Sequence, residues 1–144
     1  MVINFKQSSE VGLAEDIAYT FADGIYGFAD YKQFVFINQT QDIANPFRLM
    51  VALDAPEVSF VVVPPTFVHE NYEIKIDDAE LLELGIADEQ DIMVFSIVSL
   101  ADNGSELYVN LKSPLVLSMS TRFGRQIILD ESSYQIRHVL KTDR

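Results

Sequence analysis

The chain has 144 residues, a formal net charge of −12 and no cysteine, and 49% of its residues are hydrophobic and 22% charged. This composition is typical of a globular domain, and a chain of this length buries a core without disulfides or structural metals. It excludes disulfides, thiolate nucleophiles and cysteine-bound zinc. The acidic balance argues against nucleic-acid binding, which needs basic side chains to neutralise phosphates.

We expect a single domain over residues 1–144. Residues 1–7 lack the basic and apolar pattern of a signal peptide. The longest apolar runs, such as residues 60–63, are too short to cross a bilayer. We therefore expect a cytoplasmic protein.

The first half of the chain is rich in β-branched and aromatic residues, which favour strands. Strands are predicted at residues 2–5, 17–21, 33–38, 48–53, 58–63 and 72–76. The run 58–63 is nearly all apolar, and we expect it to be buried on both faces. It must end at Pro64-Pro65, because consecutive prolines cannot donate to a sheet ladder.

One short helix is predicted around residues 78–84. Asp77 or Asp78 is a suitable N-cap, and the spacing of Asp77 and Glu80 resembles a capping box. Gly85 is placed to end the helix. Acidic residues near the positive end of the helix dipole have a structural reason to be there. The expected apolar face consists of three leucines: Leu81, Leu82 and Leu84.

The second half of the chain alternates strands and turns. Strands are predicted at 92–100 and 106–112, on either side of Asn103-Gly104, a strong hairpin signal because both residues tolerate positive φ. A second hairpin is predicted from 115–119 and 125–129, with its tip at 121–124. Residues 134–140 are expected to form a strand or a short helix. Together these elements predict a mainly β fold, a small, antiparallel, barrel-like single domain with one short helix.

The sequence shows no recognisable catalytic motif. His69 and His138 lack the spacing of metal ligands, and there is no phosphate loop, dinucleotide fingerprint or serine-hydrolase elbow. Carboxylate pairs such as Asp54 with Glu57, or Asp88 with Asp91, are common in acidic proteins and usually solvated. We therefore expect no enzymatic activity, no cofactor and no metal.

The negative charge is concentrated between residues 70 and 91, where nine acidic residues accompany a single lysine. A localised field of this kind attracts basic surfaces and repels nucleic acid. It also opposes self-association, so we expect a monomer. The alternative is that these acids only keep the protein soluble.

Ordered motifs along nearly the whole chain resemble those of the flagellar assembly factor FliW family. Residues 21–28 are similar to that family's F-x-x-G-I-x-G-F opening, and residues 53–62 to its L-D-x-P-x-x-x-F-x-V stretch. The most specific likeness is between residues 110–117 and the family's N-L-K-[AS]-P segment. Two positions depart from the pattern, since Tyr26 stands where the family often has proline and Pro64 where aspartate is common.

The resemblance implies a non-enzymatic β protein that binds flagellin and the RNA-binding translational regulator CsrA. By binding CsrA such a protein relieves repression of flagellin messenger RNA, and flagellin competes as the second partner. We expect five acids to hold the basic regulator: Asp78, Glu83, Asp88, Glu89 and Asp91. We expect four further residues to contact one partner or the other: Ile25, Phe28, Asn110 and Phe123. The sequence leaves open whether the two partners share one surface.

Some of these candidates have plainer structural explanations. Ile25 and Phe28 are also suited to the core, and Asn110 to pairing the turn before Pro114. Phe123, at a predicted hairpin tip, has little core to reach. Aromatic residues and arginines frequently anchor protein interfaces, and arginines flank it on both sides.

Two other function classes stay open at this point. One is a small-ligand-binding β-barrel of unknown specificity, lined by the many phenylalanines, although small barrels usually fill their interiors with side chains. The other is a hydrolase, which would require a buried carboxylate pair with a perturbed pKa in a cleft.

Overall fold

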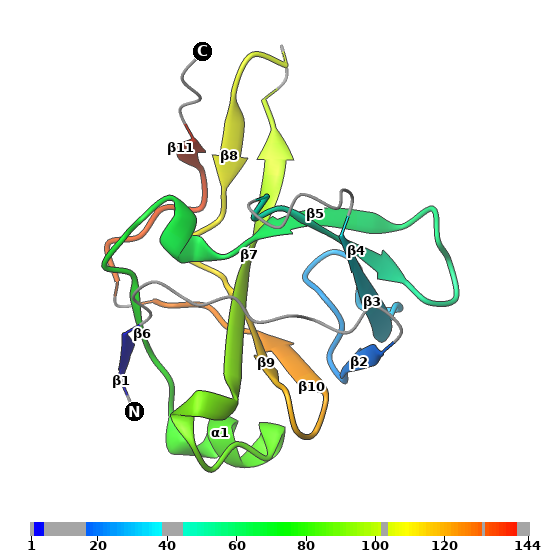
Figure 1. Cartoon of the computed structure of the whole chain (residues 1–144), viewed down its shortest axis with the longest axis vertical. Coiled ribbons are helices and arrows are strands. Elements are labelled where there is room, and N and C mark those ends of the chain that lie inside the picture. Colours follow the sequence, from blue (N-terminus) through cyan, green and yellow to red (C-terminus); the bar gives the residue numbers. More distant parts are fainter. Residues whose placement is uncertain (1, 5–16, 39–44, 102–103, 131, 141–144) are drawn as a thin grey trace.

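The computed structural model describes residues 2–4, 17–38, 45–101, 104–130 and 132–140. Within these ranges it contains eleven strands, one α-helix and two short 3-10 helices (Figure 1). The strands are β1 (Val2–Asn4), β2 (Ala18–Phe21), β3 (Gln33–Asn38), β4 (Arg48–Ala52), β5 (Ser59–Val63), β6 (Glu73–Lys75), β7 (Ile92–Leu100), β8 (Leu107–Val109), β9 (Leu115–Ser118), β10 (Phe123–Gln126) and β11 (His138–Leu140). The helices are η1 (Pro65–Phe67), α1 (Asp78–Leu84) and η2 (Glu89–Asp91). No helix in the described ranges is both long and apolar enough to cross a membrane.

Seven strands close into a barrel. They are hydrogen-bonded in the order β7, β5, β4, β3, β2, β10 and β9, and β9 pairs back with β7 to complete the ring. The contact between β2 and β10 is parallel, and the others in the ring are antiparallel. The ring and the single short helix confirm the predicted barrel-like, mainly β fold. The parallel contact was not foreseen, because β10 reaches β2 from a distant part of the chain rather than through a hairpin.

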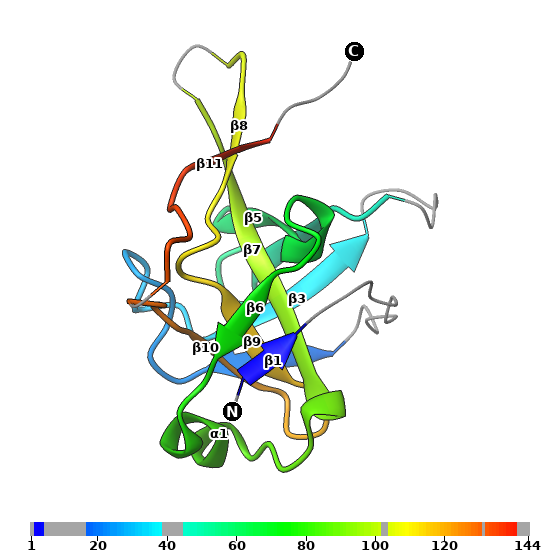
Figure 2. The ribbon, with the colours of Figure 1, turned by 90° about the vertical axis from the view of Figure 1, so that its left-hand side faces the viewer.

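Strand β7 connects the barrel to the rest of the molecule. Its residues 92–95 pair with β9 and its residues 96–98 with β5, while residues 98–100 pair with β8. Strands β8 and β11 continue this sheet beyond the barrel, and β1 and β6 form a separate two-stranded sheet. In both views the β7–β8 hairpin projects at one end of the molecule and α1 lies at the other (Figures 1 and 2).

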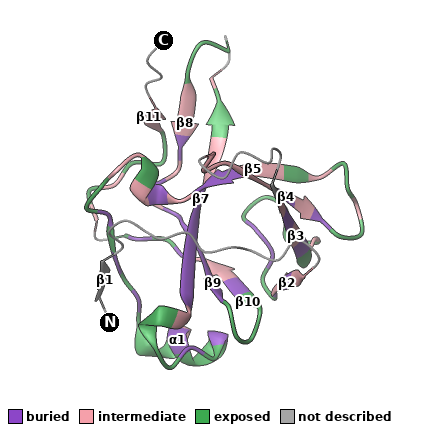
Figure 3. Ribbon diagram, in the orientation of Figure 1, coloured by how far each residue is buried: buried purple, intermediate pink, exposed green. Residues whose placement is uncertain are grey.

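Two clusters of buried side chains lie on opposite sides of the wall formed by β7 and β9. Met93 and Phe95 belong to the inner cluster, within the barrel, whereas Ile92, Val94 and Val116 belong to the outer cluster. Residues 92–96 and 115–118 are all buried (Figure 3). The inner cluster also contains four large, fully buried side chains: Phe21, Phe34, Phe36 and Met50. The wall is therefore apolar on both faces.

The sequence predicted two-sided burial for residues 58–63, and only the end of this strand has it. Of β5, only Val62 and Val63 are buried, and Ser59 is exposed. The strand ends before Pro64, as predicted, and the chain then turns through η1. Val62 belongs to the inner cluster and Val63 to the outer cluster, so burial on both faces is confined to the end of β5 and extends further along β7 and β9.

Helix α1 lies close to its predicted position. Gly85 ends it in the left-handed conformation, with φ 72°. The predicted capping box is wrong, because within the described residues Asp77 makes no side-chain cap hydrogen bond. The helix turns Leu81 and Leu84 toward the core, but Leu82 is 80% exposed. The predicted three-leucine face therefore contains only two buried leucines.

Other boundaries shift by a few residues. Strand β10 begins at Phe123 rather than at residue 125, so the tip of the hairpin is residues 119–122, where Arg122 has φ 65°. Gly104 has φ 72°, as the predicted β7–β8 turn requires, whereas Asn103 lies outside the described residues. Residues 134–140, predicted as strand or helix, contain strand β11.

Gly124 offers a test of packing where β10 meets β2. It pairs with Phe21, and a Cβ atom added at this glycine would lie 2.6 Å from the fully buried Phe21 ring. We expect Gly124→Ala to lower the free energy of unfolding, measured by urea denaturation, by about 1–3 kcal/mol.

The double variant Gly124→Ala/Phe21→Leu provides the control. A smaller side chain at position 21 leaves room for the added methyl group, so the combined loss should be less than the sum of the two single losses. Additive losses would contradict the close approach of these two residues.

Candidate protein-binding surface

The acidic segment, residues 70–91, is fastened to the turn between β9 and β10. The Asp91 carboxylate accepts hydrogen bonds from the Ser118 hydroxyl at 2.7 Å, the Ser120 hydroxyl at 2.8 Å and the Ser120 backbone N–H at 2.9 Å. Burial raises the pKa of Asp91, but these hydrogen bonds outweigh it and hold the pKa below its ordinary value. Asp91, expected as a partner contact, is thus already occupied within the protein.

The C-terminal end of α1 is held by the same turn. The Thr121 hydroxyl donates a hydrogen bond to the Leu84 carbonyl at 2.7 Å. Gly85 lies so close that a Cβ atom there would be 2.7 Å from the Thr121 methyl group. The helix is therefore fixed against the barrel at its end, and its exposed side chains stand on a rigid support.

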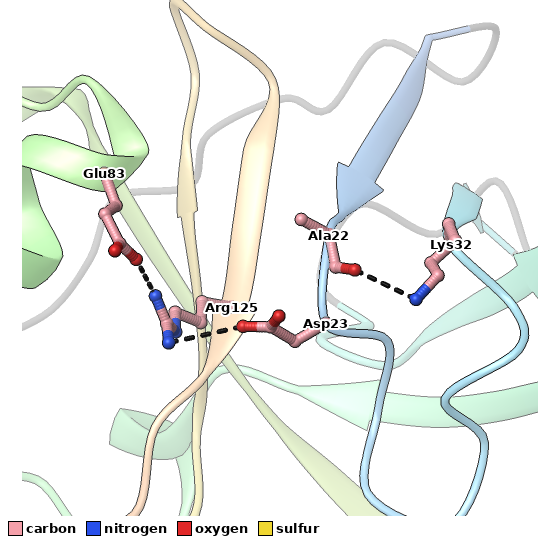
Figure 4. Close-up of polar contacts among 5 residues, drawn as sticks. All are labelled: Ala22, Asp23, Lys32, Glu83 and Arg125. Atoms are coloured by element: carbon pink, nitrogen blue, oxygen red, sulfur yellow. Dashed lines mark hydrogen bonds and ion pairs between the residues drawn. The ribbon is translucent and has the colours of Figure 1, made fainter.

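Arg125 ties the helix to the loop after β2. Its guanidinium donates to the Glu83 carboxylate and lies 3.2 Å from that of Asp23 (Figure 4). In the same loop the Lys32 ammonium donates to the Ala22 carbonyl at 2.9 Å. Burial lowers the pKa of Arg125, but the hydrogen bond that the guanidinium donates to Glu83 and the charges of the nearby carboxylates outweigh this effect and hold the pKa above its ordinary value. Glu83 therefore has a local counter-charge, which weakens its contribution to any field outside.

Three of the five predicted acids face solvent without such compensation. Asp78, Asp88 and Glu89 are exposed, and they belong to α1 and to the start of η2. Asp88 accepts a hydrogen bond from the Gln90 backbone N–H at 3.0 Å, which caps η2. We call Asp78, Asp88 and Glu89, with the exposed Leu82, the acidic face.

Leu82 was missed as a surface candidate, because the sequence pattern placed it on the core side of the helix. It lies four residues after Asp78, so the two side chains are neighbours on the same side of α1. An exposed leucine beside carboxylates offers an apolar contact within a charged rim, the usual anatomy of a protein interface.

The four other candidates fall into different environments. Ile25 is 2% exposed and belongs to the inner cluster, so it is a core residue and not a surface contact. Phe28 is 40% exposed, and its ring packs edge-on against Phe60 at 5.1 Å between centroids. Phe123 is 46% exposed at the start of β10, and it remains a candidate although it does not form the hairpin tip.

Asn110 has the structural function that the sequence offered as the alternative. Its side-chain oxygen accepts hydrogen bonds from the backbone N–H groups of Lys112 at 3.2 Å and Ser113 at 3.0 Å. This arrangement is an Asx turn, which positions the chain ahead of Pro114. The Asn110 oxygen is therefore engaged within the protein.

In the described residues the structure does not assemble the features that a hydrolase or a small-ligand-binding barrel requires. Asp54 and Glu57 are both exposed, and Asp88 and Asp91 each bind backbone or serine groups. In the described part of the chain no three His, Cys, Asp or Glu side chains are placed to hold a metal. The barrel interior is filled by the aromatic and aliphatic side chains of the inner cluster.

The structure also contains a groove that the sequence did not indicate. It has a volume of about 710 Å³ and lies between β6 and residues 127–130 and 132–134. Its two walls are some fifty residues apart in the chain, and no local pattern in either wall predicts that they meet. The sequence alone therefore does not predict this groove.

Comparison with known proteins places the chain beside one family. The model of the family described as FliW protein matches residues 2–140. Proteins named "Flagellar assembly factor FliW" are similar: that of Clostridium botulinum (strain Alaska E43 / Type E3) is 31% identical, over 97% of this chain and 98% of the relative. That of Clostridium novyi (strain NT) is 34% identical, over 97% and 96%. A solved structure, described as the crystal structure of the flagellar assembly factor FliW, superposes with a TM-score of 0.79 at 30% identity, covering 100% of this chain and 99% of the other.

Asp91 provides a test of how the acidic segment is held. Its pKa is lowered from 3.8 by the folded structure, so the stability it contributes is present above pH 3.8 and is lost as the pH falls through the lower, folded pKa. We expect Asp91→Asn to reduce the free energy of unfolding at pH 7 by about 1–3 kcal/mol. When urea denaturation is repeated at lower pH, the difference in the free energy of unfolding between the variant and the parent protein should become smaller below pH 3.8.

Asp88→Asn is the matched control, because Asp88 is exposed and accepts a hydrogen bond from the Gln90 backbone N–H alone among the described residues. At pH 7 this variant should lower the free energy of unfolding by less than Asp91→Asn does. If Asp91→Asn lowers the free energy of unfolding by the same amount at every pH, Asp91 is not an ionised, hydrogen-bonded carboxylate in the folded protein.

Proposed function

The chain belongs to the FliW family, and on that premise we propose that it is a non-enzymatic flagellar assembly factor that binds CsrA and, in competition, flagellin. The observation that carries the proposal is the family match over residues 2–140, together with relatives that are named flagellar assembly factors rather than enzymes. Those relatives match over nearly their whole length. Because CsrA acts on messenger RNA, the proposal places this protein in the cytoplasm.

The acidic face supports binding to a basic regulator. An RNA-binding surface must be basic, and Asp78, Asp88 and Glu89 present exposed carboxylates on a rigid support. One unit charge at about 10 Å in water contributes about 0.4 kcal/mol. Several such charges sum to about 1–2 kcal/mol at low salt, and about 1.4 kcal/mol already changes occupancy tenfold. The field alone therefore weakens RNA binding by a docked CsrA.

Apolar contacts complete the proposed interfaces. Leu82 lies within the acidic face, and we propose it as the apolar anchor for CsrA. Phe28 and Phe123 are exposed elsewhere on the barrel and are proposed contacts for CsrA or flagellin. We expect Glu83 and Asp91 to act indirectly, because both hold the acidic segment in place.

The first test is a calorimetric titration with the CsrA of the same organism at roughly 50 mM and 300 mM salt. We expect tight binding that weakens as the salt concentration rises, because screening reduces the attraction between the acidic face and a basic surface. Tight binding that is indifferent to salt would contradict the electrostatic part of the proposal. Absence of binding at both concentrations would contradict CsrA as a partner.

The second test reverses charge on the acidic face. We expect Asp88→Lys/Glu89→Lys to weaken CsrA binding at least about tenfold and to flatten its salt dependence. Both residues are exposed, and Asp91 stays intact, so the fold is preserved. The matched control is Asp54→Lys/Glu57→Lys, which makes the same charge change in the exposed turn before β5. Equal losses in the two variants would show that only the net charge matters.

A further inference from the structure

The loop after β2, residues 22–32, carries two exposed aromatic side chains, and we call it the aromatic loop. Tyr26 is 62% exposed and Phe28 is 40% exposed. The Phe28 ring packs against Phe60 and Tyr31, with centroids 5.1 Å and 6.4 Å away, so only part of it reaches solvent. In the described part of the chain the Tyr26 ring contacts no other aromatic ring. Exposed tyrosines of this kind are frequent anchors of protein interfaces.

The backbone of the aromatic loop forms a tight turn that is fixed in the barrel. The Phe28 backbone N–H donates to the Ile25 carbonyl at 2.6 Å, and the Ile25 side chain is buried in the inner cluster. Gly24 has φ 70°, and a Cβ atom there would lie 2.5 Å from the Ala29 Cα atom. The turn therefore holds Tyr26 at its corner, while its base is part of the core.

Two consecutive residues of β10 hold the loop from outside. The Arg125 guanidinium lies 3.2 Å from the Asp23 carboxylate (Figure 4). The Gln126 side chain accepts a hydrogen bond from the Tyr26 backbone N–H at 2.9 Å and donates one to the Ser113 carbonyl at 3.2 Å. Because Gln126 binds the backbone of Tyr26, it fixes this residue and leaves the exposed ring accessible. A contact that is already fixed before binding loses less conformational entropy when a partner binds.

The aromatic loop is neutral within a chain of net charge −12. Its two acids, Asp23 and Asp30, are balanced by Lys32 and by the bound Arg125. The acidic segment, by contrast, carries nine acids and one lysine. A neutral surface exerts no long-range attraction on a basic partner, so its affinity has to come from the burial of apolar area. The loop therefore suits an uncharged, apolar segment of a partner protein.

The aromatic loop also lies beside the helix that carries the acidic face. The Arg125 guanidinium contacts both Asp23 of the loop and Glu83 of α1 (Figure 4). A protein interface of ordinary size buries about 800 Å² on each partner, which is more than either surface alone provides. Two proteins docked on these adjacent surfaces would therefore overlap.

We propose that the aromatic loop binds an uncharged, apolar segment of flagellin, with Tyr26 as the anchor and Gln126 as the residue that positions it. This inference rests on the proposed function, in which CsrA and flagellin compete. The basic regulator is attracted to the acidic face, which leaves the neutral loop to the second partner. Competition then results from steric overlap between adjacent sites.

The test compares Tyr26→Ala with the parent protein in calorimetric titrations with monomeric flagellin and with CsrA of the same organism. The substitution removes the ring but keeps the backbone N–H that Gln126 binds. We expect the dissociation constant for flagellin to rise at least about tenfold, and equally at roughly 50 mM and 300 mM salt. The dissociation constant for CsrA should change less than about twofold. The matched control, Phe67→Ala, removes a comparably exposed ring from η1 and should change flagellin binding less than about twofold.

A second pair of variants tests the positioning of the loop. Gln126→Leu removes both hydrogen bonds of the side chain at similar volume, and we expect it to weaken flagellin binding about fivefold. Gln126→Glu keeps an oxygen that accepts from the Tyr26 backbone N–H, so it should restore most of the affinity. Equal losses in the leucine and glutamate variants would overturn the positioning by this hydrogen bond.

The outcomes separate this inference from the proposed function. Binding of flagellin by Tyr26→Ala as tight as that of the parent protein would overturn the inference and leave the proposed function intact. An equal loss in Phe67→Ala would overturn the loop as the site. An equal loss of CsrA and flagellin binding in Tyr26→Ala would overturn the assignment of the loop to flagellin. If the parent protein binds no flagellin, the inference and the flagellin part of the proposed function both fail.

Discussion

The structure depends on a wall of two strands that is apolar on both faces. Met93 and Phe95 of β7 fill the barrel, while Ile92 and Val94 of the same strand pack against the outer layer. Burying a large aliphatic or aromatic side chain contributes about 1.5–3 kcal/mol, and the two cores take alternate residues of the same two strands. The outer layer, which carries β6 and α1, therefore depends on Ile92, Val94 and Val116 of the barrel wall for part of its core.

This dependence determines how the candidate surfaces are positioned. The acidic segment is part of the outer layer. Hydrogen bonds of Asp91 and Thr121 attach it to the β9–β10 turn. Arg125 adds a second link, between the helix and the loop after β2. The acidic face is thus anchored to the barrel through these contacts, which hold its charges in a fixed position relative to the barrel.

Local patterns in the sequence predicted what depends on neighbouring residues. Gln33–Asn38 and Ile92–Leu100 were predicted with their observed bounds, because both are runs of β-branched, aromatic and other apolar residues. Gly85 correctly marked the end of α1. What depends on distant packing was missed. Leu82 looked like a core residue until the barrel was in place, and the continuous apolar run at residues 92–95 was not interpreted as burial on both faces. The groove has walls from separate parts of the chain, so no pattern in either part predicts it.

The parallel contact between β2 and β10 has a consequence for biosynthesis. Phe21 of β2 pairs with Gly124 of β10, about one hundred residues later in the chain. A ribosome-bound chain that has not yet released residues 123–126 presents β2 with one edge unpaired and the Phe21 ring uncovered. The ring of strands cannot close before residues 123–126 have left the ribosome, so the nascent protein carries an aggregation-prone edge until then.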